Sequence, residues 1–489
     1  MNTRIKYRHQ APCLTCAPSA TETTNVPPDS GQPVSGPSSC FAHPRVLKNI
    51  RSQIAKNRVL STADARLARS MGLLGIPGVG RTGWNDGTIY PVDDTPQRVG
   101  AQMRGIRPSD RASLASASGK LNCLVLMVDF SDNVGSKPAA HFEKLLFDRS
   151  NANSMASFYS ELSYGKLDVS GKVVGWLRAS KPYAFYTNGE SGTGNTFPQN
   201  VPGLLQEALQ LYCQTNNLST FDLNGDGFVD GLFLVHAGPG AEAEPVPSKR
   251  ADKIWSHKWT LPSPFVNSGV KAFAYFTAPE DGKLGVFSHE FGHFLGLPDL
   301  YDTSYRSSGI GDWCLMAGGS WNGGGNVPAR LSAWCLANLG WIKPTNVKLA
   351  TTLTLDTLAN DPLACYRLWT GGKANPEYFL IENRQKAGRD ADIPASGLAV
   401  WHIDETQADN TNALAYRVGL VQADGKRDME LNRNEGDDGD VFPGKSKVTA
   451  LSDKGNLSPT TRANDGSKTG VSLSGIKLTN GIATVKVKV

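Results

Sequence analysis

Two histidines four residues apart, His289 and His293, lie in the stretch SHEFGHFLGLPDLYD of residues 288–302. Residues four apart on a helix lie one turn apart on the same face, so both imidazole rings can point at one metal ion. Glu290 follows the first histidine and is placed to polarise a water molecule and carry its proton to a leaving amine, as in the HExxH pattern. These three residues predict a zinc site that hydrolyses amide bonds.

The third zinc ligand is predicted to be Asp299. Gly296 comes three residues after His293, where a helix can end in a left-handed turn, and Pro298 prevents the helix from continuing. Asp299 then falls six residues after His293, which is where the longer HExxHxxGxxH pattern places its third ligand. A carboxylate oxygen is an accepted zinc ligand. Asp302 is the alternative ligand, and otherwise it would orient a ligand or cap the turn.

A methionine in a glycine-rich turn, Met316, follows in the stretch GIGDWCLMAGGSWNG of residues 309–323. In the metzincin peptidases such a methionine lies beneath the zinc site as an apolar floor. A lone methionine would be an ordinary core residue, but the long zinc motif favours the floor role. Of the other histidines, His236 would either line the cleft or be structural at a strand end, and His402 is assigned no chemistry.

The segment DLNGDGFVDG, residues 222–231, carries oxygen-bearing side chains at the spacing of a Ca²⁺-binding loop. The residues at loop positions 1, 3, 5 and 9 are Asp222, Asn224, Asp226 and Asp230. Position 12 is Phe233 instead of Glu, so the bidentate ligand is missing or comes from elsewhere. The segment predicts either a structural calcium site or a solvated turn that leads into a strand.

The elements that must hold these residues are predicted from the apolar pattern. Residues 120–132 form an apolar run of strand length, and GLFLVHAGPG predicts a second buried strand from Gly231. Between the two strands, apolar residues recur at helical spacing from Met155 to Leu162. Strands and helices alternate in this way up to about Trp341, which is typical of a mixed α/β arrangement.

The chain of 489 residues is long enough for several cores, and its pattern predicts three parts. Residues 1–118 are expected to be a disordered leader and propeptide, since their first 40 residues are rich in Pro, Ser, Thr and Gly. Residues 119–342 are expected to be the catalytic domain. Residues 343–489 contain short alternating runs such as GLAVWHID and IATVKVKV, which predict a β-sandwich-like C-terminal domain. The predicted fold class is α+β.

Charge and hydropathy narrow the classes of partner. The formal net charge is +5, and residues 41–120 hold 13 Lys and Arg against 5 Asp. A basic leader explains this asymmetry as well as a polyanion does, so no nucleic-acid partner is predicted. No apolar run approaches the ~18 residues of a membrane span, and no apolar core of a secretion signal is readable near the N-terminus. Among eight cysteines, Cys314 and Cys335 would form a disulfide if the protein is exported.

The motifs resemble those of the immune inhibitor A family of secreted bacterial zinc metalloendopeptidases. The resemblance rests on HEFGHFLGLPDLYD, WCLMAGGSWNG, SELSYGKLDVSG, DLNGDGFVDGLFLVHAGPG and PARLSAWCLANLGWI, and runs from about residue 120 to the C-terminus. It implies a metzincin-like catalytic domain, a β-rich domain behind it, structural calcium, secretion, synthesis as a zymogen and protein or peptide substrates. By position it implies zinc ligands at His289, His293 and Asp299, the catalytic base at Glu290 and the Met-turn at Met316.

Zinc-dependent hydrolysis of peptide bonds in proteins, by a monomer, is therefore the predicted function. Two alternatives stay open: a binding or surface protein with a vestigial metal site, and a narrow-specificity metal-dependent amidase that acts on cell-wall peptides. In a zymogen the pro-segment can place a thiolate on the zinc, and Cys40 in SSCFAHPRV is the available thiol nearest to an ordered-looking segment.

Overall fold

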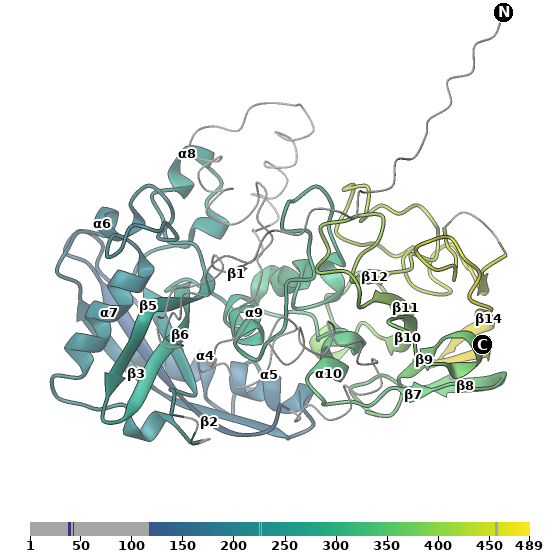
Figure 1. Ribbon diagram of the computed structural model, residues 1–489, viewed down its shortest axis with the longest axis horizontal. Coiled ribbons are helices and arrows are strands. Elements are labelled where there is room, and N and C mark those ends of the chain that lie inside the picture. The colour runs from purple at the N-terminus through teal and green to yellow at the C-terminus, as the bar shows by residue number, and fades with distance from the viewer. Residues whose placement is uncertain (1–37, 41–42, 44–116, 224, 226, 455–457) are drawn as a thin grey trace, which may run out of the picture. The chain divides into compact units, whose positions relative to one another are not determined.

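The computed structural model describes residues 38–40, 43, 117–223, 225, 227–454 and 458–489 (Figure 1). Most of the predicted leader, residues 1–118, lies outside the described residues. Asn224 and Asp226 of the predicted calcium loop also lie outside them. No helix in the described part of the chain combines the length and apolar character that crossing a membrane requires.

A six-stranded mixed sheet holds the first part of the structure, in the strand order β1-β5-β6-β4-β2-β3 (Figure 1). The pairs β2–β3, β2–β4 and β4–β6 are parallel, whereas β5 pairs antiparallel with both β6 and β1. The bounds are Ser38–Ser39 for β1, Gly119–Asp129 for β2, Leu167–Arg178 for β3, Gly231–His236 for β4, His257–Asn267 for β5 and Val270–Pro279 for β6. The two strands predicted from the apolar runs are β2 and β4, and they are neighbours.

The side chains of β2 alternate between two apolar cores, one on each face of the sheet. Cys123, Val125 and Met127 pack into one core, and Leu124 and Leu126 pack into the other. Successive side chains of a strand point to opposite faces, so a strand that is buried on both faces needs an unbroken apolar run. This requirement explains the sequence pattern of the strand.

Helices cover both faces of this sheet. The core around Val125 receives side chains from α4 (Ala139–Leu146), α5 (Met155–Leu162) and α9 (Leu284–Phe294). The opposite core receives them from α6 (Tyr183–Thr187) and α7 (Val201–Tyr212). The short helices α8 (Pro247–Arg250) and α10 (Ala333–Asn338) follow β4 and α9 along the chain. The predicted helix over Met155–Leu162 and the mixed α/β arrangement are confirmed.

Two further sheets follow α10 and make the C-terminal part rich in β structure, as predicted. One has the strand order β12-β11-β10-β9-β7 and the other the order β13-β14-β15-β8. Their strands span Thr345–Asn346 (β7), Thr351–Leu355 (β8), Tyr366–Leu368 (β9), Glu377–Arg384 (β10), Gly397–Asp404 (β11), Val418–Leu420 (β12), Leu451–Ser452 (β13), Ser472–Thr479 (β14) and Ile482–Lys488 (β15). Figure 1 shows these strands in green to yellow.

The five-stranded sheet is buried on both faces. Trp401 of β11 packs into the same core as helix α9, whereas its neighbour Val400 packs into a core shared with the four-stranded sheet. Leu355 of β8 and Val485 of β15 line that second core. The C-terminal strands therefore pack directly against the part of the chain that carries the predicted metal ligands.

Candidate metal centre

Helix α9 carries both histidines and is buried along its whole length. It ends with Leu295 as its C-cap, and Gly296 follows with φ of +95°. The amide of Gly296 donates to the carbonyl of His293 at 3.0 Å, and the amide of Leu297 donates to the carbonyl of Gly292 at 3.0 Å. A residue with a side chain is strained at this φ, so glycine is needed where the chain turns back. This turn brings Asp299 next to the two histidine rings.

The three predicted zinc ligands lie together: one possible ligand atom from each side chain is within 4.8 Å of the other two. The Nε2 atoms of His289 and His293 are 3.0 Å apart. Oδ1 of Asp299 lies 3.2 Å from the first Nε2 and 3.1 Å from the second. In the part of the chain that the structure describes, this is the one group of three such side chains close enough to hold a metal ion.

Backbone carbonyls orient both imidazole rings. Nδ1 of His289 lies 2.9 Å from the carbonyl oxygen of Leu315, and Nδ1 of His293 lies 2.8 Å from that of Leu297. A ring nitrogen that faces a carbonyl carries the proton, so both Nε2 atoms present lone pairs toward Asp299. Lone-pair donors held this close repel one another unless a cation lies between them. The donor set of two nitrogens and one carboxylate therefore fits a divalent metal such as zinc.

The protonation states agree with this fit. Burial lowers the pKa of His289, which favours the neutral ring that binds a metal. Burial would raise the pKa of Asp299, but hydrogen bonds and charge from protonated histidine rings lower it; a cation held between these groups would act in the same direction and keep the carboxylate ionised.

Glu290 is a buried carboxylic acid that has no hydrogen-bond partner among the described residues. Its exposed fraction is 0%, and neither carboxylate oxygen has a hydrogen-bond partner among the described residues. Burial raises the pKa of Glu290, and the nearby carboxylate of Asp299 adds to the effect. An unpaired buried polar group destabilises a fold by about 1–3 kcal/mol, and such groups concentrate where chemistry needs them. The carboxyl is therefore available to a water molecule or a substrate.

Met316 packs against α9 at Gly292, which lies between His289 and His293 along the helix. A Cβ atom added at Gly292 would lie 2.5 Å from the sulfur of Met316, so the methionine contacts the helix backbone itself. The carbonyl of Met316 also accepts a hydrogen bond of 2.8 Å from the amide of Leu300, just after Asp299. Met316 thus contacts both helix α9 and the chain that follows Asp299.

Replacing Gly285 with alanine is expected to destabilise the fold by about 1–3 kcal/mol, the range for overpacking in a dense core. Gly285 lies in the first turn of α9, and an added Cβ would come 1.8 Å from the carbonyl oxygen of Ser320, a backbone atom that cannot move away cheaply. Urea unfolding measures the change. Gly175→Ala is the control, because a Cβ there meets nothing within 4 Å. Equal stability of the two variants would contradict the packing shown for α9.

The alternative third ligand, Asp302, is occupied elsewhere. Its Oδ1 accepts from the amide of Ser304 at 2.8 Å, and its Oδ2 accepts from the amide of Ser307 at 2.9 Å. It therefore caps the turn that follows the site.

Tyr159 of α5 also holds the site, since its hydroxyl donates to the carbonyl of Ser288 at 2.5 Å. Tyr159 and the orienting carbonyls were missed from the sequence, because a carbonyl acceptor is present at every residue and its partner lies far along the chain.

The described part of the predicted calcium loop binds the backbone. Oδ2 of Asp222 accepts from the amide of Gly227 at 3.0 Å. Oδ2 of Asp230 accepts from the amides of Asn122 at 2.8 Å and Leu223 at 3.1 Å. Calcium binding there stays a prediction.

His236 and the cysteine pair are buried, whereas His402 is partly exposed. His236 is fully buried at the end of β4, and burial lowers its pKa to about 4. His402 contacts Glu377 through Nε2 at 2.8 Å in the C-terminal part. Cys314 and Cys335 are neighbouring buried thiols, so their disulfide stays a prediction.

Cys40 is buried beside strand β5, although it is far from the metal ligands along the chain. Strand β1, just before it, pairs antiparallel with the edge strand β5. The amide of Cys40 donates to the carbonyl of Ser256, and its carbonyl accepts from the indole of Trp255, both at 2.9 Å. The side chain is 0% exposed. Burial raises the pKa of its thiol, and the charges of Glu290 and Asp299 contribute to the rise, which places the sulfur within their electrostatic reach.

Comparison with known proteins points to one family. Residues 136–342 match the family model described as "Immune inhibitor A peptidase M6, catalytic domain". The chain is similar to "Immune inhibitor A" of Bacillus thuringiensis subsp. alesti, with 32% identity over 300 residues, which is 50% of this chain and 44% of the relative. It is also similar to "Pre-pro-metalloprotease PrtV" of Vibrio cholerae serotype O1 (strain M66-2), with 36% identity over 234 residues, 40% of this chain and 25% of the relative. The matches span less than half the length of these curated relatives. The predicted resemblance is confirmed over residues 136–342, which match the catalytic domain of the immune inhibitor A peptidase M6 family of metallopeptidases.

Proposed function

We propose that the chain is a zinc-dependent endopeptidase in which His289, His293 and Asp299 hold the ion and Glu290 is the general base. The observation that carries this proposal is the convergence of three oriented metal-ligating groups beside a buried carboxyl that has no partner among the described residues. A bound zinc ion would supply Lewis-acid chemistry toward a peptide carbonyl and a water molecule.

Protein side chains and carbonyls transfer the proton and orient the metal ligands. Glu290 takes a proton from the attacking water at one carboxylate oxygen and delivers it to the leaving amine. Its raised pKa keeps that proton available for the second step. The carbonyls of Leu315 and Leu297 hold the two imidazole rings in one tautomer, and Met316 forms an apolar floor beneath them.

The wider architecture that we propose has three parts. A leader of residues 1–118 precedes a metzincin-like catalytic domain of residues 119–342, and a β-sandwich-like domain of residues 343–489 follows. The shared apolar core of the two C-terminal sheets supports the sandwich. We further propose secretion, protein or peptide substrates, a monomeric state and a structural calcium ion at the loop of Asp222 and Asp230.

We propose that the enzyme is made as a zymogen and that Cys40 maintains its latency. The segment at β1 pairs with β5 and buries Cys40 within electrostatic reach of Glu290 and Asp299. A thiol there would compete with water for the metal, and the paired segment would cover the edge of β5 from an extended substrate.

Removing residues 1–118 is expected to raise cleavage of unfolded casein, and a chelator is expected to abolish it. The measurement combines zinc content per chain with casein cleavage, with and without the leader. Chelator-sensitive cleavage that rises on removal of the leader would support a zinc protease held as a zymogen. One bound zinc without cleavage in any form would favour the narrow-specificity amidase, and no bound zinc would favour the binding protein.

The role of Cys40 is tested with cobalt in place of zinc. In the full chain we expect an absorption band from sulfur-to-cobalt charge transfer, and we expect Cys40→Ser to lose it and to cleave casein faster. Cys213→Ser is the matched control, since Cys213 is a half-buried thiol after α7. A band that survives in Cys40→Ser would contradict the latency proposal without affecting the proposed zinc site.

A further inference from the structure

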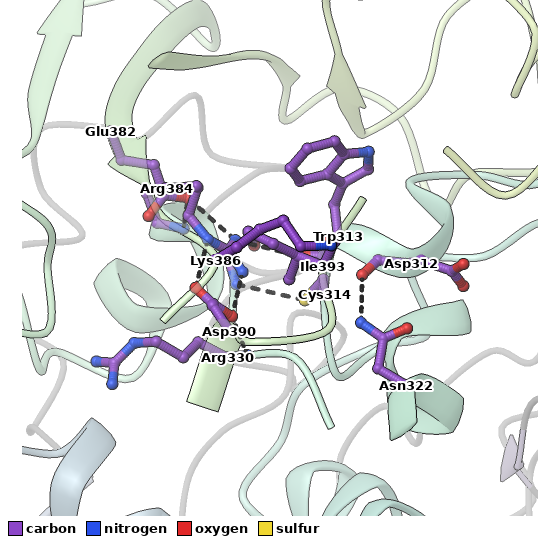
Figure 2. A network of polar contacts seen from close by, with 12 residues as sticks. Asp312, Trp313, Cys314, Asn322, Arg330, Glu382, Arg384, Lys386, Asp390 and Ile393 are labelled. Atoms are coloured by element: carbon purple, nitrogen blue, oxygen red, sulfur yellow. Dashed lines mark hydrogen bonds and ion pairs between the residues drawn. The ribbon is translucent and has the colours of Figure 1, made fainter. Parts of the chain in front are cut away.

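The last residue of β10, Arg384, is a buried cation that lies outside the matched family domain. Its exposed fraction is 2%. Nε and Nη2 donate to the two carboxylate oxygens of Asp390, both at 2.8 Å. The remaining nitrogen, Nη1, donates to the carbonyl oxygen of Trp313 at 3.0 Å. Figure 2 shows this fork between Arg384 and Asp390 with Trp313 beside it.

The contact with Trp313 leads directly to the metal centre. Trp313 lies two residues before Leu315, whose carbonyl oxygen orients His289. Three residues after Trp313 is Met316, which packs against α9. Anchoring the carbonyl of Trp313 therefore limits the positions that the carbonyl of Leu315 and the side chain of Met316 can take.

A second arm of the same network reaches Leu315 from its other side. Oδ1 of Asp390 accepts a hydrogen bond of 2.9 Å from the amide of Arg330. The carbonyl of Arg330 in turn accepts from the amide of Leu315 at 3.3 Å. Arg384 and Asp390 thus hold Leu315 both through its own chain and through the neighbouring segment.

The energetics favour a role in geometry over a role in bulk stability. A buried ion pair contributes little net stability, because the desolvation of both charges offsets their attraction. Directional hydrogen bonds to a carbonyl, in contrast, fix where that carbonyl points. Outer partners of a metal-binding histidine typically change metal affinity or activity by about 10–100-fold when they are lost.

We propose that Arg384, with Asp390, is a positioning residue for the metal centre: it fixes the Trp313–Met316 segment so that the Leu315 carbonyl orients His289. The C-terminal sheet is then part of the catalytic unit and not an independent appendage. This inference rests on the proposed zinc site, and it deepens that proposal by assigning a role to a residue beyond residues 136–342.

The test replaces Arg384 in the full chain and measures zinc affinity by competition with a chelator, together with the visible spectrum of the cobalt form. For Arg384→Met we expect zinc affinity to fall by about 10–100-fold and the cobalt spectrum to shift. We also expect kcat on a casein-derived peptide to fall while KM stays unchanged. Arg384→Lys keeps one donor for the Trp313 carbonyl and should recover part of the affinity.

Arg389→Met is the matched control. Arg389 is another cation of the C-terminal part, with an exposed side-chain fraction of 11%, and it donates to Glu161 at 2.6 Å. Arg389 also donates to the carbonyl of Ala152 and lies over the ring of Phe158, and it contacts neither Trp313 nor Leu315. We expect its zinc affinity and cobalt spectrum to match those of the unchanged protein.

The outcome is readable even where hydrolysis or folding fails. The tautomer of His289, observed by nitrogen NMR in the metal-free chain, needs neither metal nor activity, and we expect Arg384→Met to lose the pure Nδ1–H form. If that variant does not fold, Asp390→Asn receives the same measurements, since it weakens both arms without changing volume. Zinc affinity, cobalt spectrum and tautomer all equal to those of Arg389→Met would overturn the inference. Loss of hydrolysis in the unchanged protein would instead count against the proposed function.

Discussion

Replacing Glu290 with glutamine is expected to lower kcat/KM for casein by about 10²–10⁴-fold, the usual contribution of a general acid–base group. The amide keeps the volume of the carboxyl in a site where Glu290 is 0% exposed, but it cannot accept the proton of the attacking water. We expect one zinc per chain in the variant, because Glu290 is not among the three converging ligands. Cleavage of casein and metal content, measured on the same preparation without its leader, check both parts.

Two controls distinguish loss of the catalytic base from loss of the fold. Unchanged unfolding in urea would show that the loss of activity does not come from loss of fold, and replacing Glu290 with alanine should abolish hydrolysis as well. Casein cleavage at the normal rate in either variant would remove Glu290 from the role of base. Loss of zinc together with activity would instead move it to the metal-binding set.

Replacing Asp299 with alanine is expected to lower both zinc binding and hydrolysis. Its Oδ1 lies 3.2 and 3.1 Å from the two histidine Nε2 atoms, so its loss leaves a metal with two protein ligands. Loss of an outer hydrogen-bond partner of a ligand lowers metal affinity by about 10–100-fold. We expect loss of the ligand itself to lower zinc affinity by more than that. Competition with a chelator measures the affinity, and casein cleavage measures the activity.

Asp302→Asn is the matched control for this prediction. Asp302 is an acidic residue of the same loop whose oxygens accept from Ser304 and Ser307. The control should keep its zinc and lose only stability, by about 1 kcal/mol for weakened turn hydrogen bonds. The reverse pattern, with zinc lost in Asp302→Asn and kept in Asp299→Ala, would make Asp302 the third ligand.

Local elements could be predicted because their signals are local. The helical spacing of apolar residues matches α5 over Met155–Leu162, and the apolar run from Gly231 matches β4 over Gly231–His236. A helix face and a doubly buried strand each repeat over a few residues, so their pattern is complete within one segment. The calcium loop shows the limit of such patterns, since spacing alone did not reveal that Asp230 accepts from the amide of Asn122.

By itself the sequence determined the ligand spacing on α9, the turn at Gly296 and the position of Asp299 after it, because all three depend on helix geometry and on the backbone freedom of glycine. Only the tertiary structure decided what holds that site in place. Three hydrogen bonds join segments that lie far apart along the chain: those of His289 to the Leu315 carbonyl, of Arg384 to the Trp313 carbonyl, and of the Cys40 amide to the Ser256 carbonyl. No fixed separation in the sequence marks such contacts, because only the folded sheets bring their partners together.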